Sequence, residues 1–273
     1  PVHALEDLGS PVRSVVSQRN RAVVLLEKAP PFLWSLDDGL EKPLQGSKSP
    51  ATSARWSPDG RSISVGSPDG VARIYDAESG NELYRADMSH YAVLDTAWTP
   101  DGRFLYVGAL NGAIHKLEAK SGEHSGALNL EFAVEDMRLE AQGDGRVAAT
   151  VKRAGAWEVR IFAAGGSGMM RVGPFGTEPV ACLGWKAFAA AEGSDVFVRD
   201  LTVKSVPKRL RGHENTIRAL DVRGGHALIS ASADGTATVW DLRGRRGISE
   251  ILPPAQLGTV IYLHDGGSAL ATR

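Results

Sequence analysis

The chain has 273 residues, of which 42% are hydrophobic and 23% are charged, and its formal net charge at pH 7 is −1. This length suits one large globular domain, and the balanced charge excludes a general electrostatic attraction to nucleic acid or to anionic membranes. The single cysteine excludes an internal disulfide and a cysteine-based metal site, and no apolar run approaches the ~20 residues that a transmembrane helix needs.

The chain begins with a predicted strand, Val2–Leu8, which is followed by Ser10-Pro11 and a further β-type run from Val12. The same order recurs much later, where Arg209-Leu210 precedes Gly212-His213 and another strand pattern. Residues 1–9 are therefore expected to form the outer strand of a unit whose other strands lie at the opposite end of the chain.

The structural unit is clearest in residues 52–87. Turn sequences at Ser57-Pro58-Asp59-Gly60, Asp69-Gly70 and Ser79-Gly80 separate short runs in which apolar residues alternate with polar ones. Glycine after an acidic residue is typical of a tight hairpin turn, because the turn needs a positive φ. The predicted strands are Thr52–Trp56, Ser62–Gly66, Val71–Tyr75 and Leu83–Ala86.

This unit repeats with a period of 42 residues. Trp56 with its following turn recurs at Trp98, Asp69-Gly70 recurs at Asn111-Gly112, and Ser79-Gly80 recurs at Ser121-Gly122. Four short strands in a period near 42 predict an all-β, seven-bladed β-propeller of four-stranded antiparallel blades. The predicted blades span 11–46, 52–87, 92–127, 133–170, 178–211, 215–251 and 257–273 plus 1–9, as one domain over 1–273.

The N-terminal strand is expected to close the ring by pairing with the C-terminal blade, so that only short strand edges stay exposed. The tail supplies two predicted strands, Thr259–His264 and Ser268–Ala271. The seventh blade therefore has three strands in this sequence instead of four.

Residues 210–242 resemble a WD repeat, because they contain Gly212-His213, a central Asp234-Gly235 turn and Trp240-Asp241. The other repeats keep less of this motif, and Tyr75-Asp76 stands where Trp-Asp is expected. The resemblance to the WD-repeat family implies a structural hydrogen-bonded set of His213, Ser230 or Ser232, Asp234 and Trp240.

Residues for partner binding are predicted at the ends of the strands. Aligned repeats place charged residues at the start of several innermost strands, where they either pair with one another around a channel mouth or form a mixed-charge platform for a partner. Aromatic and arginine side chains in nearby loops are favoured interface anchors. The predicted partner-binding residues are Arg13, Tyr91, Asp95, Leu110, Asp136, Arg153 and Arg218.

The sequence favours a non-catalytic protein–protein interaction scaffold, as a subunit or domain of a larger complex. It has no phosphate-binding loop, no nucleophile elbow and no histidine pair with metal-ligand spacing, so no cofactor, metal or catalytic residue is predicted. The alternative is a propeller that binds phosphoinositides at a membrane surface, with weak anionic-lipid contact at Arg245 and Arg246. An enzyme or small-ligand receptor that uses the central channel is the third hypothesis. No signal peptide is recognised, so a cytoplasmic or nuclear location is expected.

Overall fold

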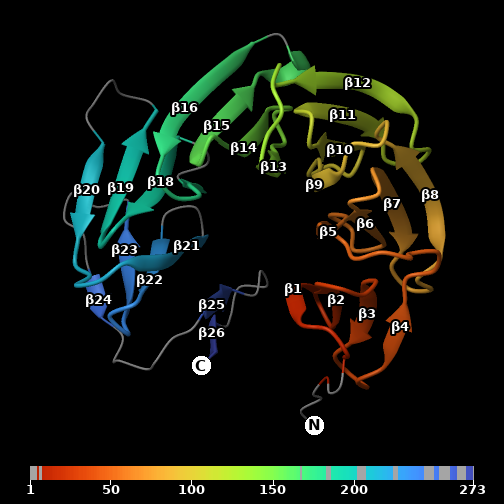
Figure 1. The fold of residues 1–273 in the computed structure, drawn as a ribbon, viewed down its shortest axis with the longest axis horizontal. Helices are drawn as coiled ribbons and strands as arrows, with labels where there is room; N and C mark the ends of the chain where they lie inside the picture. Colours follow the sequence, from red (N-terminus) through yellow and green to blue (C-terminus); the bar gives the residue numbers. More distant parts are fainter. Residues whose placement is uncertain are drawn as a thin grey trace. The chain divides into compact units, whose positions relative to one another are not determined.

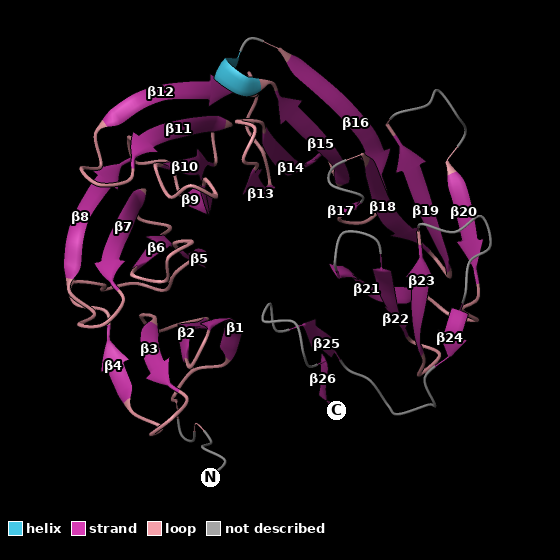
Figure 2. Ribbon diagram, turned by 180° about the vertical axis from the view of Figure 1, so that it is seen from behind, coloured by secondary structure: helices cyan, strands magenta, loops and turns pink. Residues whose placement is uncertain are grey.

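The computed structural model describes residues 5, 8–166, 168–182, 186–201, 207–223, 227–242, 249–251, 259–262 and 269–272. Within these residues the regular structure is β-strand, apart from one short 3₁₀ helix, Ala164–Gly166 (Figure 2). The strands form antiparallel sheets, which confirms the predicted all-β fold. The chain divides into two compact units, Pro1–Ala154 with Val159–Val172 and Gly155–Glu158 with Gly173–Arg273.

Four four-stranded sheets follow one another from the N-terminal end, and each is built from strands that are consecutive in the sequence (Figure 1). Their strands are β1 Val12–Gln18, β2 Arg21–Leu26, β3 Phe32–Ser35, β4 Glu41–Pro43, β5 Ser53–Trp56, β6 Ser62–Gly66, β7 Val71–Asp76, β8 Glu82–Asp87, β9 Val93–Trp98, β10 Phe104–Ala109, β11 Ala113–Glu118, β12 His124–Asn129, β13 Asp136–Ala141, β14 Val147–Arg153, β15 Ala156–Phe162 and β16 Met169–Phe175.

Two further four-stranded sheets and one two-stranded sheet complete the described strands. Their strands are β17 Val180–Cys182, β18 Ala187–Glu192, β19 Asp195–Asp200, β20 Lys208–Arg211, β21 Ile217–Arg223, β22 Ala227–Ser232, β23 Ala237–Asp241, β24 Ser249–Ile251, β25 Thr259–Tyr262 and β26 Ala269–Thr272. A buried apolar cluster that includes Val196, Leu228 and Trp240 joins the sheet of β17–β20 to that of β21–β24.

The four strands predicted in residues 52–87 correspond to β5–β8, and their bounds differ by at most one residue at either end. The two strands predicted in the tail correspond to β25 and β26, which pair with each other. Most of the predicted strand Val2–Leu8 lies outside the described residues. Its pairing with the last blade and the count of seven blades therefore stay predictions.

Local turn chemistry explains why each unit folds into a sheet. The Asp69 carboxylate accepts a hydrogen bond from the backbone N–H of Val71 at 2.9 Å, and Asn111 holds Ala113 in the same way at 3.1 Å. The glycine that follows each of these residues has a positive φ, 82° at Gly70. Such turns reverse the chain between the second and third strands of a blade.

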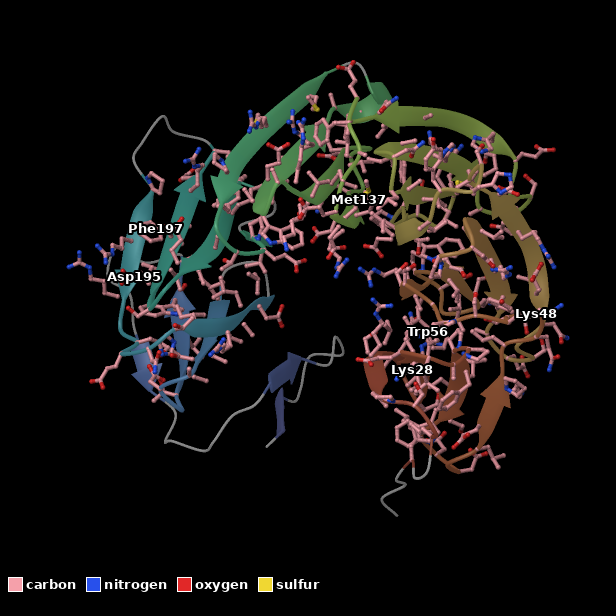
Figure 3. The ribbon with its side chains drawn as sticks, viewed as in Figure 1. Lys28, Lys48, Trp56, Met137, Asp195 and Phe197 are labelled. Atoms are coloured by element: carbon pink, nitrogen blue, oxygen red, sulfur yellow. The ribbon has the colours of Figure 1, made fainter. Side chains whose placement is uncertain are left out.

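Neighbouring sheets of the first unit pack on one another, and their innermost strands β1, β5, β9 and β13 lie side by side in that order (Figure 1). Met137, labelled in Figure 3, is fully buried and fills the space beside Gly108 of the preceding sheet, where a Cβ atom would overlap its sulfur. A single sheet cannot bury its apolar face alone, so the apolar core forms where neighbouring blades stack.

Two tryptophans 42 residues apart tie these inner strands together. The indole N–H of Trp56 (Figure 3) donates to the carbonyl oxygen of Val16 at 2.8 Å, and that of Trp98 donates to the Ser64 hydroxyl at 3.0 Å. Each bond links a strand to the sheet before it. The repeated tryptophans therefore stabilise the contact between blades.

Two histidines meet on the outer part of the third sheet. The rings of His115 on β11 and His124 on β12 lie edge to face, with their centroids 4.9 Å apart. Burial, and then the charge of His124, lower the pKa of His115. The fold therefore favours the neutral form of His115.

Candidate functional site

The sheet β21–β24 contains the hydrogen-bonded set that the resemblance implies. The Trp240 indole N–H lies 2.9 Å from the Ser230 hydroxyl oxygen, which lies 2.7 Å from Nε2 of His213. The His213 Nδ1 atom lies 3.0 Å from Asp234. A neutral His213 with its proton on Nδ1 satisfies every bond in this chain. Ser232 lies outside the set, since its hydroxyl donates to the Asn215 carbonyl oxygen at 2.8 Å.

The surroundings of Asp234 keep its carboxylate ionised. Burial alone would raise the pKa of Asp234, but hydrogen bonds from the Thr236 hydroxyl, the backbone of Glu214 and Thr236, and His213 hold the pKa well below its usual range. The side chain of His213 is fully buried. The arrangement fixes a turn and a strand against each other and presents no reacting group to solvent.

Charged residues at the innermost strands of the first unit are largely paired. Asp95 on β9 is fully buried, and one of its oxygens accepts from the Arg55 guanidinium at 3.0 Å and from the backbone N–H of Leu139 at 2.9 Å. Asp136 pairs with Arg138 on the same strand at 2.6 Å. Asp95 therefore joins β5, β9 and β13, and its burial argues against direct contact with a partner.

The loops between blades are held by backbone hydrogen bonds to the turns on both sides. The N–H of Met88 donates to Gly70 at 2.8 Å, and the N–H of Leu110 in the next blade donates to Ala92 at 2.9 Å. The first of these bonds repeats one blade later, where the N–H of Leu130 donates to the carbonyl oxygen of Gly112 at 3.1 Å. There the N–H of Val134 also donates to the carbonyl oxygen of Leu110 at 3.0 Å. These bonds hold the side chains on this face of the first unit in fixed positions.

Four side chains form what we call the loop-face strip, which consists of Tyr91, Leu110 and Phe132 on turns and loops and of Arg153 at the end of strand β14. Tyr91 and Leu110 are 47% and 38% exposed. The guanidinium of Arg153 lies 4.3 Å from the ring centroid of Phe132, and that of Arg160 lies 5.2 Å from it. The strip thus combines exposed apolar surface with two cations held on one aromatic ring.

The sequence prediction included three residues of this strip and missed Phe132. A signal was available, because Phe132 lies 42 residues after His90, in the equivalent interblade loop. Arg160 was also missed, because it lies inside strand β15 and not in a loop. Only the packing of β15 beneath that loop brings Arg160 to the ring.

The other predicted residues are not members of the strip. Arg13 on β1 donates to the carbonyl oxygen of Ala51 at 3.3 Å. Arg218 on β21 lines a cavity of about 350 Å³ in the second unit, together with Thr177 and Val180. Arg245 and Arg246 lie outside the described residues.

The described residues contain no group of three or more histidine, cysteine, aspartate or glutamate side chains that could hold a metal ion. In the same part of the chain, no helix has the length and apolar character to cross a bilayer.

Comparisons with known proteins agree with this architecture. Residues 204–241 match the family model of the WD domain, G-beta repeat, and residues 32–94 match that of the anaphase-promoting complex subunit 4 WD40 domain. No curated protein matches the chain.

Solved structures share the fold at low sequence identity. A chain of the crystal structure of the mitotic checkpoint complex is 17% identical with a TM-score of 0.65, and the match covers 93% of this chain and 86% of that one. The structure of U3-55K is 20% identical with a TM-score of 0.57, and the match covers 75% of this chain and 64% of that one. At these identities the likeness shows the fold alone.

The repeated four-stranded antiparallel sheets and the matching structures define the fold as a β-propeller. The matched family models and the His213–Ser230–Trp240 bonds show that this propeller carries WD repeats.

Proposed function

We propose that this chain is a non-catalytic protein-interaction module that binds a partner protein through the loop-face strip. The observation that carries the proposal is the combination of exposed Tyr91 and Leu110 with a Phe132 ring on which Arg153 lies. Backbone hydrogen bonds hold the loops of the first three, and Arg153 ends strand β14. Rigid aromatic and arginine side chains lose little conformational entropy on binding and dominate the energy of many interfaces.

The family supports the same conclusion at a coarser level. WD-repeat propellers bind other proteins, and one structure with this fold is a chain of the mitotic checkpoint complex. The hydrogen-bonded set around His213 supports a structural role, because its groups are buried and satisfied by one another. No observation on the described residues favours the phosphoinositide alternative.

Affinity capture with the 273-residue chain as bait tests the proposal, with bound proteins quantified by mass spectrometry. Tyr91→Ala removes an exposed aromatic ring of the strip, and Leu83→Ala is the matched control, because Leu83 is 54% exposed on the outer strand β8. We expect a stoichiometric partner that L83A retains and Y91A loses. Truncation of an interface anchor costs about 2 kcal/mol or more, a loss of roughly thirtyfold in affinity.

A second variant separates loss of contact from loss of fold. Arg153→Glu reverses a charge that sits on an exposed side chain, and it should weaken the same partner while the melting temperature stays near that of the wild type. A partner bound equally by the wild type and both strip variants, or the lack of any stoichiometric partner, contradicts the proposal.

A further inference from the structure

A cavity of about 250 Å³ opens between the third and fourth sheets of the first unit, away from the loop-face strip. The side chains of Phe104, Tyr106 and Lys116 line it from the third sheet. The facing wall comes from the turn at 142–145, from Val147 and from the turn at 163–166. Both walls belong to the first unit.

Two polar side chains of this cavity, those of Tyr106 and Lys116, have no hydrogen-bond or ion-pair partner among the described residues. The side chain of Tyr106 is buried with its residue 7% exposed, yet no hydrogen bond joins its hydroxyl to another described residue. The Lys116 ammonium lies 3.6 Å from the ring centroid of Phe104, and no carboxylate of the described chain pairs with it. The Tyr106 hydroxyl is accessible from the cavity, so it can donate to a ligand there.

In the described part of the chain, the cavity wall carries one cation, Lys116, and one carboxylate, Asp101, and only the carboxylate is hydrogen-bonded within the wall. The Asp101 carboxylate accepts from the Thr99 hydroxyl at 2.6 Å and from the backbone N–H of Arg103 at 3.0 Å. These two hydrogen bonds, the one from Thr99 above all, and then the nearby Arg103 charge lower the pKa of Asp101. The bonds also hold the turn that precedes β10. Lys116 is therefore the cation left for a ligand.

The walls also favour an extended chain over a compact ligand. Glycines at 126, 143, 145, 165 and 166 line both walls of the cavity, and without side chains they leave its backbone groups open to a ligand. Cavities that enclose whole cofactors or drug-sized molecules measure about 300–1,000 Å³. A cavity of about 250 Å³ is smaller and matches one or two side chains carried by a peptide.

We infer that this cavity is a second binding site, which takes a short extended segment of a partner protein with an acidic residue beside an apolar one. The carboxylate pairs with Lys116 and accepts from the Tyr106 hydroxyl, and the apolar side chain packs on Leu128 and Val147. A dianionic phosphate suits the site less well than a carboxylate, because Asp101 stands in the wall.

The test uses random dodecapeptides displayed on phage, selected on the full 273-residue chain. The best peptide is then synthesised with a fluorescent label, and its Kd is measured by polarisation. Lys116→Gln removes the charge, and Tyr106→Phe removes only the hydroxyl. The matched control is Lys120→Gln, an exposed lysine in the turn after β11 that does not line the cavity.

We expect the selected peptides to share an acidic residue next to an apolar one. K116Q should then weaken binding about tenfold or more, and Y106F by about threefold to tenfold, in line with charged and neutral hydrogen bonds. K120Q should bind like the wild type, and melting temperatures should show that the variants are folded.

The loop-face variant Tyr91→Ala distinguishes this site from the proposed interaction surface, and it should leave peptide binding unchanged. The inference is overturned if no peptide is enriched or if the enriched peptides lack an acidic residue. It is equally overturned if folded K116Q binds as tightly as K120Q, or if Y91A abolishes binding, because the peptide then lies on the loop face.

Discussion

Ser230 offers the sharpest test of how this protein is held together. Its hydroxyl oxygen accepts from the Trp240 indole N–H at 2.9 Å and lies 2.7 Å from Nε2 of His213, and the Ser230 side chain has no exposed surface. Ser230→Ala removes the hydroxyl and leaves both ring nitrogens buried without a partner. At about 1–2 kcal/mol for each of the two groups, we expect a loss of about 2–4 kcal/mol in the free energy of unfolding.

The assay is urea denaturation with thermal melting as a second measure. For a chain of this size, a loss of 2–4 kcal/mol corresponds to a fall in melting temperature of roughly 4–16 °C. The exchange of the Trp240 indole proton with solvent should also become faster, because its acceptor is gone. Ser125→Ala, on the exposed outer strand β12, is the control and should change stability by less than about 0.5 kcal/mol.

The reasoning is refuted if S230A unfolds within about 0.5 kcal/mol of the wild type while the Trp240 proton exchanges faster. That result would mean that the bonds exist and contribute nothing net to stability. An unchanged exchange rate would instead refute the assigned contact between the two residues.

Three further predictions concern the first unit. Asp95→Ala should lower stability by about 2–3 kcal/mol in urea titrations, because the buried N–H of Leu139 loses its acceptor. The pKa of His115 is lowered by burial and then by its histidine neighbour, so the neutral form stabilises the fold above pH 6.5 and this contribution is lost as the pH falls below it. Melting temperatures from pH 7.5 to 5.5 should therefore fall less in His115→Gln than in the wild type, and equal slopes would contradict this. Gly112→Ala should destabilise by clearly more than Gly102→Ala, since both glycines have a positive φ but only at the first would a Cβ overlap backbone. The second change should cost only the ~1–2 kcal/mol of left-handed strain.

Local patterns in the sequence were enough to predict the strands and turns. Asp69-Gly70 and Asn111-Gly112 form their turns through bonds between residues two apart, and such chemistry is visible in a single repeat. The equal spacing of Trp56 and Trp98 then indicated that one unit recurs, and β5–β8 lie where that unit predicted them.

The choice between Ser230 and Ser232 shows where the sequence stops being sufficient. The two serines lie two apart on β22, so they point to the same face and the strand pattern treats them alike. The position of the His213 ring decides between them, and it bonds to Ser230.

The sequence by itself determined the all-β fold, the repeating blade and the WD-type motif, because each depends on residues close together in the chain. Only the tertiary structure decided which side chains meet across blades. It buried Asp95 between three strands, set Arg160 on Phe132, and left Lys116 without an acidic partner among the described residues. The surroundings of a residue in a propeller come mostly from the neighbouring blade, about 40 residues away, and no local pattern specifies those contacts.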